Sequence, residues 1–327
     1  MSRVPSDSSA EPTGADPSGR ARTARALVGE LRALRRQRWG NLWGYVFIAP
    51  ALALYLVFNI WTIVRGLLMA FTDYRFLFPK SAWEWNGLEN FAEMVSDEMF
   101  WHALGISAKF SLMVLPTTIL LALVVAILIS RVRRAARFYR WLVYLPAIIP
   151  ISVTMLLWRE LYNGEFGFIN NTLRTWGAGQ PPNWLGDPRW VLPALAVPEI
   201  WRSFGFPVLL FLVGLYSIPA ELYEAAAIDG AGAWRQVWAI SLPLLKPSIT
   251  LVVVLNAHIV GATEQVILTT QGGPQNASYT LGYYLYTLAF LQGDLRLGYA
   301  AAMALVVGLT SALIAFTTFR LLRAERA

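Results

Sequence analysis

The chain has 327 residues, of which 56% are apolar and only 14% are charged. Soluble chains carry about 25% charged residues, so this composition excludes an ordinary soluble enzyme and predicts an all-α polytopic membrane protein. There is no cysteine, which excludes disulfides and thiolate metal sites.

Taken in chain order, residues 1–42 are polar and become rich in arginine toward their end. We expect them to form a disordered, basic cytoplasmic tail. Residues 43–322 are expected to form a six-helix transmembrane domain, and 323–327 a short cytoplasmic tail. Six segments meet the length of about 20 residues that a bilayer requires. They are Tyr45–Met69, Ile106–Ser130, Trp141–Trp158, Trp190–Tyr216, Ser248–Thr270 and Leu297–Phe319.

Prolines and loop residues modify this pattern. Pro146 and Pro150 are expected to kink the third segment. The stretch Leu161–Asp187 contains Gly, Asn and Pro and is expected to be a loop. Of the 27 Lys and Arg residues, 18 lie in the N-terminal tail, after the second segment, in the central polar stretch or at the C-terminus, and only 5 lie in the segments on the opposite side. The positive-inside rule then places both termini and that central stretch in the cytoplasm.

The central polar stretch, 217–247, lies between two apolar segments and has the pattern of two short helices. Ser217 is expected to cap the first helix, with Glu221 and Glu224 near its positive end. A glycine turn at Gly230 follows, and the second helix, 233–241, is expected to stop near Pro243. The three alanines Ala225–Ala227 would let another protein approach closely, and Glu224 would anchor an arginine.

This stretch resembles the EAA loop of ATP-binding-cassette (ABC) importer permeases. The resemblance is carried by Glu224-Ala225-Ala226, by Gly230 and by Ile240-Ser241-Leu242-Pro243. It implies the type I importer permease fold and a coupling helix that docks into the cytoplasmic ATPase subunit. The residues implied for coupling are Glu224, Ala225, Ala226, Asp229, Gly230, Leu242 and Pro243. The alternative is an amphipathic hairpin that lies on the membrane, but only one basic residue, Arg235, occurs within 221–241.

A second set of motifs is similar to carbohydrate-importer permeases of the maltose and glycerol-phosphate type. It comprises Gln271-Gly272-Gly273-Pro274, Thr280-Leu281, Tyr284-Leu285-Tyr286 and Gly298-Tyr299-Ala300-Ala301. The resemblance implies a sugar or polyol substrate, a second permease, two ATPase subunits and an extracytoplasmic solute-binding protein. It also implies the cytoplasmic membrane of a prokaryote, with no cofactor. The family usually has glycine where Gln271 stands, and residues 256–258 and 262–265 also depart from its pattern.

Polar residues inside the spans are expected to mark the substrate path. Depth along the fourth and fifth spans singles out Trp201, Arg202, Asn256, Thr263 and Glu264. A wheel of the fifth span, drawn as one continuous helix, places Asn256 and Gln265 on opposite faces. Arg202 is expected to pair with Glu264 across the helices, or alternatively with Glu199 three residues earlier.

Two other functions are possible for a polytopic membrane protein. An ion-coupled secondary transporter would use carboxylates such as Glu199 and Glu264, but it leaves the central stretch unexplained and shows no clear internal repeat. A membrane-embedded enzyme would need clustered Asp or His, and the two histidines, His102 and His258, are far apart in sequence. The chain has no GxxxxGK[ST] phosphate loop, so ATP hydrolysis is expected in a separate subunit. No catalytic or metal site is expected.

Overall fold

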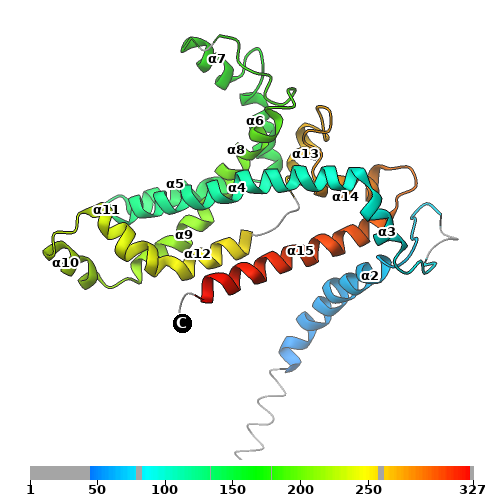
Figure 1. The fold of residues 1–327 in the computed structure, drawn as a ribbon, viewed down its shortest axis with the longest axis horizontal. Coiled ribbons are helices and arrows are strands. Elements are labelled where there is room, and N and C mark those ends of the chain that lie inside the picture. Colours follow the sequence, from blue (N-terminus) through cyan, green and yellow to red (C-terminus); the bar gives the residue numbers. More distant parts are fainter. Residues whose placement is uncertain (1–44, 79–82, 133, 178, 257–260, 325–327) are drawn as a thin grey trace, which may run out of the picture. The chain divides into compact units, whose positions relative to one another are not determined.

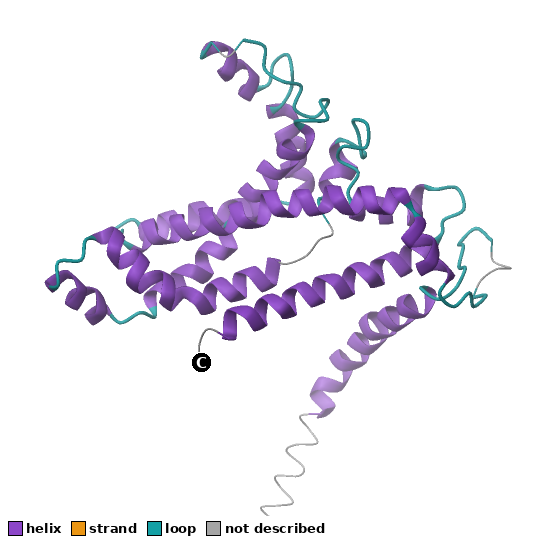
Figure 2. Cartoon of the chain, in the orientation of Figure 1, coloured by secondary structure: helices purple, strands orange, loops and turns teal. Residues whose placement is uncertain are grey.

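The computed structural model describes residues 45–78, 83–132, 134–177, 179–256 and 261–324. These residues contain helices and loops but no strand, and only two isolated bridges (Figure 2). The expected all-α class is therefore confirmed. The N-terminal tail lies outside the described residues, and the last helix continues to Ala324.

The chain divides into two units, Met1–Arg65 and Gly66–Ala327. The described part of the first unit belongs to one apolar helix, Tyr45–Met69, which has the bounds predicted for the first span. A π-helical turn, η1 (Leu56–Ile60), lies within it, and α2 (Trp61–Met69) continues it.

The helices of the second unit are shown in Figure 1. In chain order they are α3 (Glu89–Ser96), α4 (Glu98–Ser130), α5 (Ala136–Ile148), α6 (Ile151–Leu161), α7 (Phe168–Thr175), α8 (Val191–Ser203), α9 (Gly205–Tyr216), α10 (Ala220–Ile228), α11 (Ala233–Gln236), η3 (Val237–Ser241), α12 (Leu242–Asn256), α13 (Thr263–Thr269), α14 (Leu281–Tyr286), η4 (Thr287–Leu291) and α15 (Leu297–Ala324).

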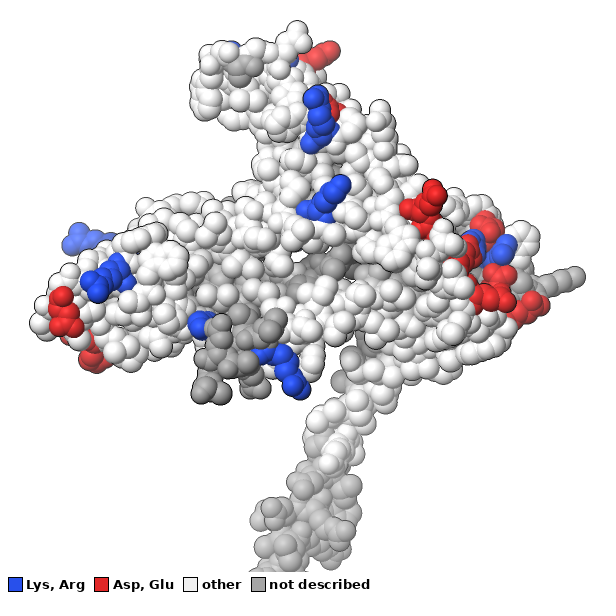
Figure 3. All heavy atoms as spheres, viewed as in Figure 1, with Lys and Arg blue, Asp and Glu red and all other residues white. Residues whose placement is uncertain are grey.

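Four of the described helices are long and apolar enough to cross a membrane, and two bent pairs raise the number to six. The single helices are Tyr45–Met69, Glu98–Ser130, Ala233–Asn256 and Leu297–Arg320. The pairs are α5 with α6 and α8 with α9. On the face shown in Figure 3, few charged side chains lie in the middle of the second unit, and acidic ones gather over α10 and around α3. This distribution fits an apolar band between two polar ends.

The 33-residue helix α4 organises the second unit. It packs against α5, α8, α9, α12 and α14. Its first turns join a core with α3, α14 and α15; its middle packs on α8 and α13; its last turns pack on α9 and α12. Small residues such as Ala122 and Ala126 are fully buried there, which allows close helix contact. The element begins at Glu98, before the predicted span.

The third predicted span is broken rather than kinked. The axes of α5 and α6 differ by 94°. Pro146 stays inside α5, whereas Ile149 and Pro150 are extended, with ψ of 128° and 140°. A residue before proline disfavours the α conformation, so the helix ends at Ile148 and restarts after Pro150. The loop expected at Leu161–Asp187 contains a short helix, α7.

Two expectations for the central stretch were wrong. Ser217 does not cap α10: it ends α9, where its hydroxyl donates to the Gly214 carbonyl at 2.7 Å, and Pro219 precedes α10. Pro243 does not stop the second short helix, because α11, η3 and α12 form one helix, Ala233–Asn256. The π turn η3 ends at Ser241, two residues before Pro243, and such a wider turn leaves more room for a proline ring than an α turn does.

Candidate functional site

The fifth predicted span is interrupted, and the interruption forms a pocket. Helix α12 ends at Asn256, whereas Gly261 has φ of +80° and Ala262 is not helical before α13 begins. The wheel drawn for one continuous helix was therefore wrong. A Cβ on Gly261 would lie 2.8 Å from Ser107 Oγ and 3.0 Å from Thr280 Cβ. Glycine thus permits both the backbone conformation and the close contact with α4.

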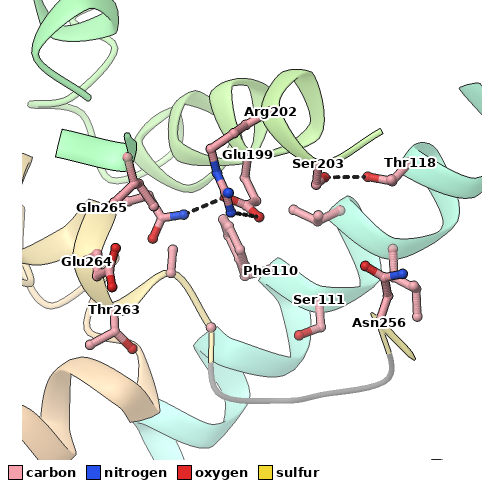
Figure 4. Close-up of a pocket in the computed structure, with 15 residues that line it drawn as sticks. Phe110, Ser111, Thr118, Glu199, Arg202, Ser203, Asn256, Thr263, Glu264 and Gln265 are labelled. Carbon is pink, nitrogen blue, oxygen red and sulfur yellow. Dashed lines mark hydrogen bonds and ion pairs between the residues drawn. The ribbon is translucent and has the colours of Figure 1, made fainter. Parts of the chain in front are cut away.

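A pocket of about 350 Å³ opens at this break, between α4, α8 and the two halves of the span. Figure 4 shows Glu199, Arg202 and Gln265 grouped together and Ser203 beside Thr118, with Glu264 and Thr263 apart from them. Its lining comprises Phe110, Ser111, Val114, Leu115, Thr118, Ile151, Glu199, Arg202, Ser203, Asn256, Gly261, Ala262, Thr263, Glu264 and Gln265. Four of the five residues predicted for the substrate path are in this set. Trp201 is not among them, and its ring instead meets that of Trp158, edge to face, with centroids 6.1 Å apart.

The strongest interaction in the pocket is an ion pair on α8. Arg202 Nη2 lies 3.0 Å from Glu199 Oε1, and Arg202 Nε donates to Glu199 Oε2 at 3.3 Å. Gln265 Nε2 donates to the same Glu199 oxygen at 2.7 Å, which ties α13 to α8. Arg202 therefore pairs with Glu199, the alternative partner, and not with Glu264. The pair is largely buried, with side chains 31% and 17% exposed.

The remaining polar groups of the pocket are mostly neutral. Thr118 and Ser203 share a hydrogen bond of 3.4 Å between α4 and α8. Asn256 donates from its amide to the Val252 carbonyl at 2.8 Å, at the end of α12. Three residues of the pocket were not predicted from the sequence: Gln265, Ser203 and Thr118. For Gln265 the reason is that a continuous helix placed it opposite Asn256. In the sequence, Gly261 and the polar run 263–265 were the only signs that the helix breaks here.

The predicted coupling residues form an exposed helical hairpin. Helix α10 contains no buried residue, Ile228 is 88% exposed, and Glu224, Ala225 and Asp229 are all exposed. Gly230 has φ of +78°, as expected for the turn. Leu242 and Pro243 lie in the first turn of α12. An apolar and acidic surface that is left uncovered within one chain suits a protein partner.

The hairpin is nevertheless fixed to the rest of the unit. The Tyr223 and Ser241 hydroxyls are 2.9 Å apart, and Gln236 Nε2 donates to the Ala231 carbonyl at 3.2 Å. Arg131, at the end of α4, donates to the Ala233 carbonyl at 3.1 Å. These bonds connect the hairpin to α4 and to the helix that continues into α12, and both α4 and α12 line the pocket.

Comparison with known proteins decides the family. Residues 111–324 match the model for the binding-protein-dependent transport system inner membrane component. The chain belongs to this family. It is 33% identical over 296 residues to the probable ABC transporter permease protein YesP of Bacillus subtilis, covering 89% of this chain and 93% of that one. It is 30% identical over 288 residues to the lactose transport system permease protein LacF of Rhizobium radiobacter, covering 86% and 95%.

Solved structures agree with this assignment. A chain of a bacterial ABC transporter involved in the import of the acidic polysaccharide alginate superposes with a TM-score of 0.74 at 26% identity, covering 89% of this chain and 99% of that one. The same kind of transporter, in complex with an alginate pentasaccharide-bound periplasmic protein, gives 0.72 at 26% identity, with coverages of 86% and 94%. The permease is thus a multi-pass subunit of the cytoplasmic membrane, not an enzyme, and ATP hydrolysis occurs in a separate subunit.

Proposed function

We propose that this permease carries a sugar or a related polyol through the pocket at the α12–α13 break. The observation that carries the proposal is the pocket itself, where hydrogen-bonding side chains surround the Glu199–Arg202 ion pair beside Phe110. Sugars are recognised by several hydrogen-bond partners together with an aromatic or apolar face. Relatives named for lactose and diacetylchitobiose transport support a carbohydrate substrate.

The proposed machine contains this chain, a second permease, two cytoplasmic ATPase subunits and an extracytoplasmic binding protein. We infer that α10 faces the cytoplasm, with both termini on the same side, because most Lys and Arg lie in the segments that six spans place on that side. The ATPase would bind the exposed surface around Glu224, Ala225, Ala226 and Asp229. Closure of the ATPase would then move α10, and through Arg131 and Ser241 the helices around the pocket.

Thr263 offers a matched test of the sugar path. Its hydroxyl has no hydrogen bond within the part of the chain that the structure describes, so it is available to a solute. Thr269, on the same helix, donates to the Gln265 carbonyl at 2.6 Å and does not line the pocket. In proteoliposomes containing the complete importer, Thr263→Val should lower the affinity for the transported sugar about five- to tenfold, the value of one hydrogen bond.

The control Thr269→Val should leave sugar uptake within the error of the measurement, because its hydroxyl only contacts its own helix. Basal ATP hydrolysis should be the same in both variants. If Thr263→Val and Thr269→Val transport the sugar equally well, the α12–α13 pocket is not the sugar path.

A further inference from the structure

The net charge of the pocket indicates which charge its solute carries, and membership of the family does not. Among the described residues that line it, three are charged: Glu199, Arg202 and Glu264. Two carboxylates and one guanidinium leave one negative charge. The similar transporters do not determine what this means, because one is named for lactose, a neutral sugar, and another for the acidic polysaccharide alginate.

Arg202 is not available as an anion receptor. Its guanidinium faces Glu199 through two nitrogens, with contacts of 3.0 to 3.3 Å. Both oxygens of Glu199 are engaged, and Gln265 adds a third donor to this carboxylate. A two-point contact of this kind fixes the orientation of both groups. An acidic solute would have to displace Glu199 and leave a carboxylate partly buried without its partner, which is costly.

Glu264 supplies the negative charge that is not neutralised. No hydrogen bond or ion pair engages its carboxylate in the described residues, and Glu264 is exposed and lines the pocket. Figure 4 shows this carboxylate beside Thr263 and apart from the Glu199–Arg202 pair. A solute in the pocket therefore meets, at the start of α13, a carboxylate that has no partner among the described residues.

We propose that Glu264 makes the pocket selective for charge: it favours neutral sugars and amino sugars and disfavours uronates and other acidic sugars. The inference rests on the proposed function and names the class of sugar. A hydroxyl or a protonated amine donates to the Glu264 carboxylate. A carboxylate on the solute repels it, and no unpaired cation among the described lining residues compensates. For selectivity by repulsion, it is enough that one charge on the solute meets one charge of the same sign in the pocket.

Three matched monosaccharides test the proposal: glucose, glucosamine and glucuronate, which are neutral, cationic and anionic. Binding to the purified importer in lipid nanodiscs, without the binding protein, is measured by saturation-transfer NMR at a pH where the amine is protonated. The wild-type importer should bind glucuronate at least roughly tenfold more weakly than glucose, and glucosamine at least as well as glucose.

Glu264→Gln keeps the size of the side chain and removes its charge. It should bring glucuronate binding to the level of glucose and abolish any advantage of glucosamine. The control Glu165→Gln, which changes an exposed carboxylate before α7, should retain the wild-type order. If the wild type binds all three sugars equally, or if Glu264→Gln retains the wild-type discrimination, charge selectivity by Glu264 is wrong while the sugar path stands. If instead sugar uptake is the same in Thr263→Val and Thr269→Val, the proposed function itself is contradicted, whatever the order of the three monosaccharides.

Discussion

Asp97 joins helix α4 to two helices that are far from it in sequence, α14 and α15. Its carboxylate accepts hydrogen bonds from the backbone of Met99 and Phe100, which caps α4. It also accepts from the hydroxyls of Tyr284 at 2.6 Å and Tyr299 at 2.7 Å, on α14 and α15. Burial acts to raise the pKa of Asp97, but these hydrogen bonds outweigh it and hold the pKa below its usual 3.8. Asp97 is therefore charged at neutral pH.

Removal of this carboxylate should destabilise the permease. Asp97→Ala leaves two phenol hydroxyls and the first turn of α4 without their acceptor, which costs roughly 1–3 kcal/mol. The change should appear as a lower melting temperature in detergent. Asp294→Ala, which breaks a half-exposed ion pair with Arg75 at 3.4 Å, is the control and should change the melting temperature little. Equal melting temperatures for the two variants would contradict the role of Asp97.

Gly230 and Gly232 form a matched pair within the coupling hairpin. A Cβ on either residue meets no atom within 4 Å, but Gly230 has φ of +78° whereas Gly232 has φ of −65°. Gly230→Val should strain the turn by about 1–2 kcal/mol and reduce co-purification of the ATPase subunit. Gly232→Val should co-purify with the ATPase like the wild type. The interpretation of the turn fails if both variants retain the ATPase equally.

At the scale of elements, the sequence predicted the spans better than their interruptions. Apolar length alone located Tyr45–Met69 and the end of α4, because these features depend only on transfer to lipid. The α5–α6 break required the extended conformation before Pro150, which the sequence indicated only as a kink. At the α12–α13 break, Gly261 lies so close to Ser107 and Thr280 that a Cβ would clash with both, and neither residue is its neighbour in sequence. No local pattern reveals such a contact. The sequence therefore predicted how deep the pocket residues lie in the membrane, but not how they are arranged around the pocket.

The α12–α13 break should respond to a single methyl group. Gly261→Ala would place a Cβ against Ser107 and Thr280 and would also force alanine into a positive φ. We expect lower yields of folded importer and at least a several-fold loss of sugar binding, because the loop that carries Thr263 must move. Gly308→Ala, in α15, meets no atom within 4 Å and should be neutral or slightly stabilising, since alanine favours helix. Wild-type sugar binding by Gly261→Ala would show that the break does not shape the pocket.

The whole molecule combines an exposed hairpin with a polar pocket, and α4 and α12 connect the two. Arg131 joins the end of α4 to the hairpin, while Phe110 and Thr118 of the same helix line the pocket. Glu224, in contrast, lies on exposed α10 and is not among the pocket residues. The account therefore predicts that coupling to the ATPase and binding of the sugar can be separated by mutation.

The most direct test is ATP-dependent sugar uptake by the complete importer in proteoliposomes, measured for wild type and Glu224→Lys together with sugar binding to the same preparations. The reversed charge should repel the arginine that Glu224 is proposed to meet on the ATPase. The account predicts that Glu224→Lys loses ATP-dependent uptake while its pocket binds sugar with wild-type affinity. Uptake by Glu224→Lys at the wild-type rate, with the ATPase still bound, would contradict the account.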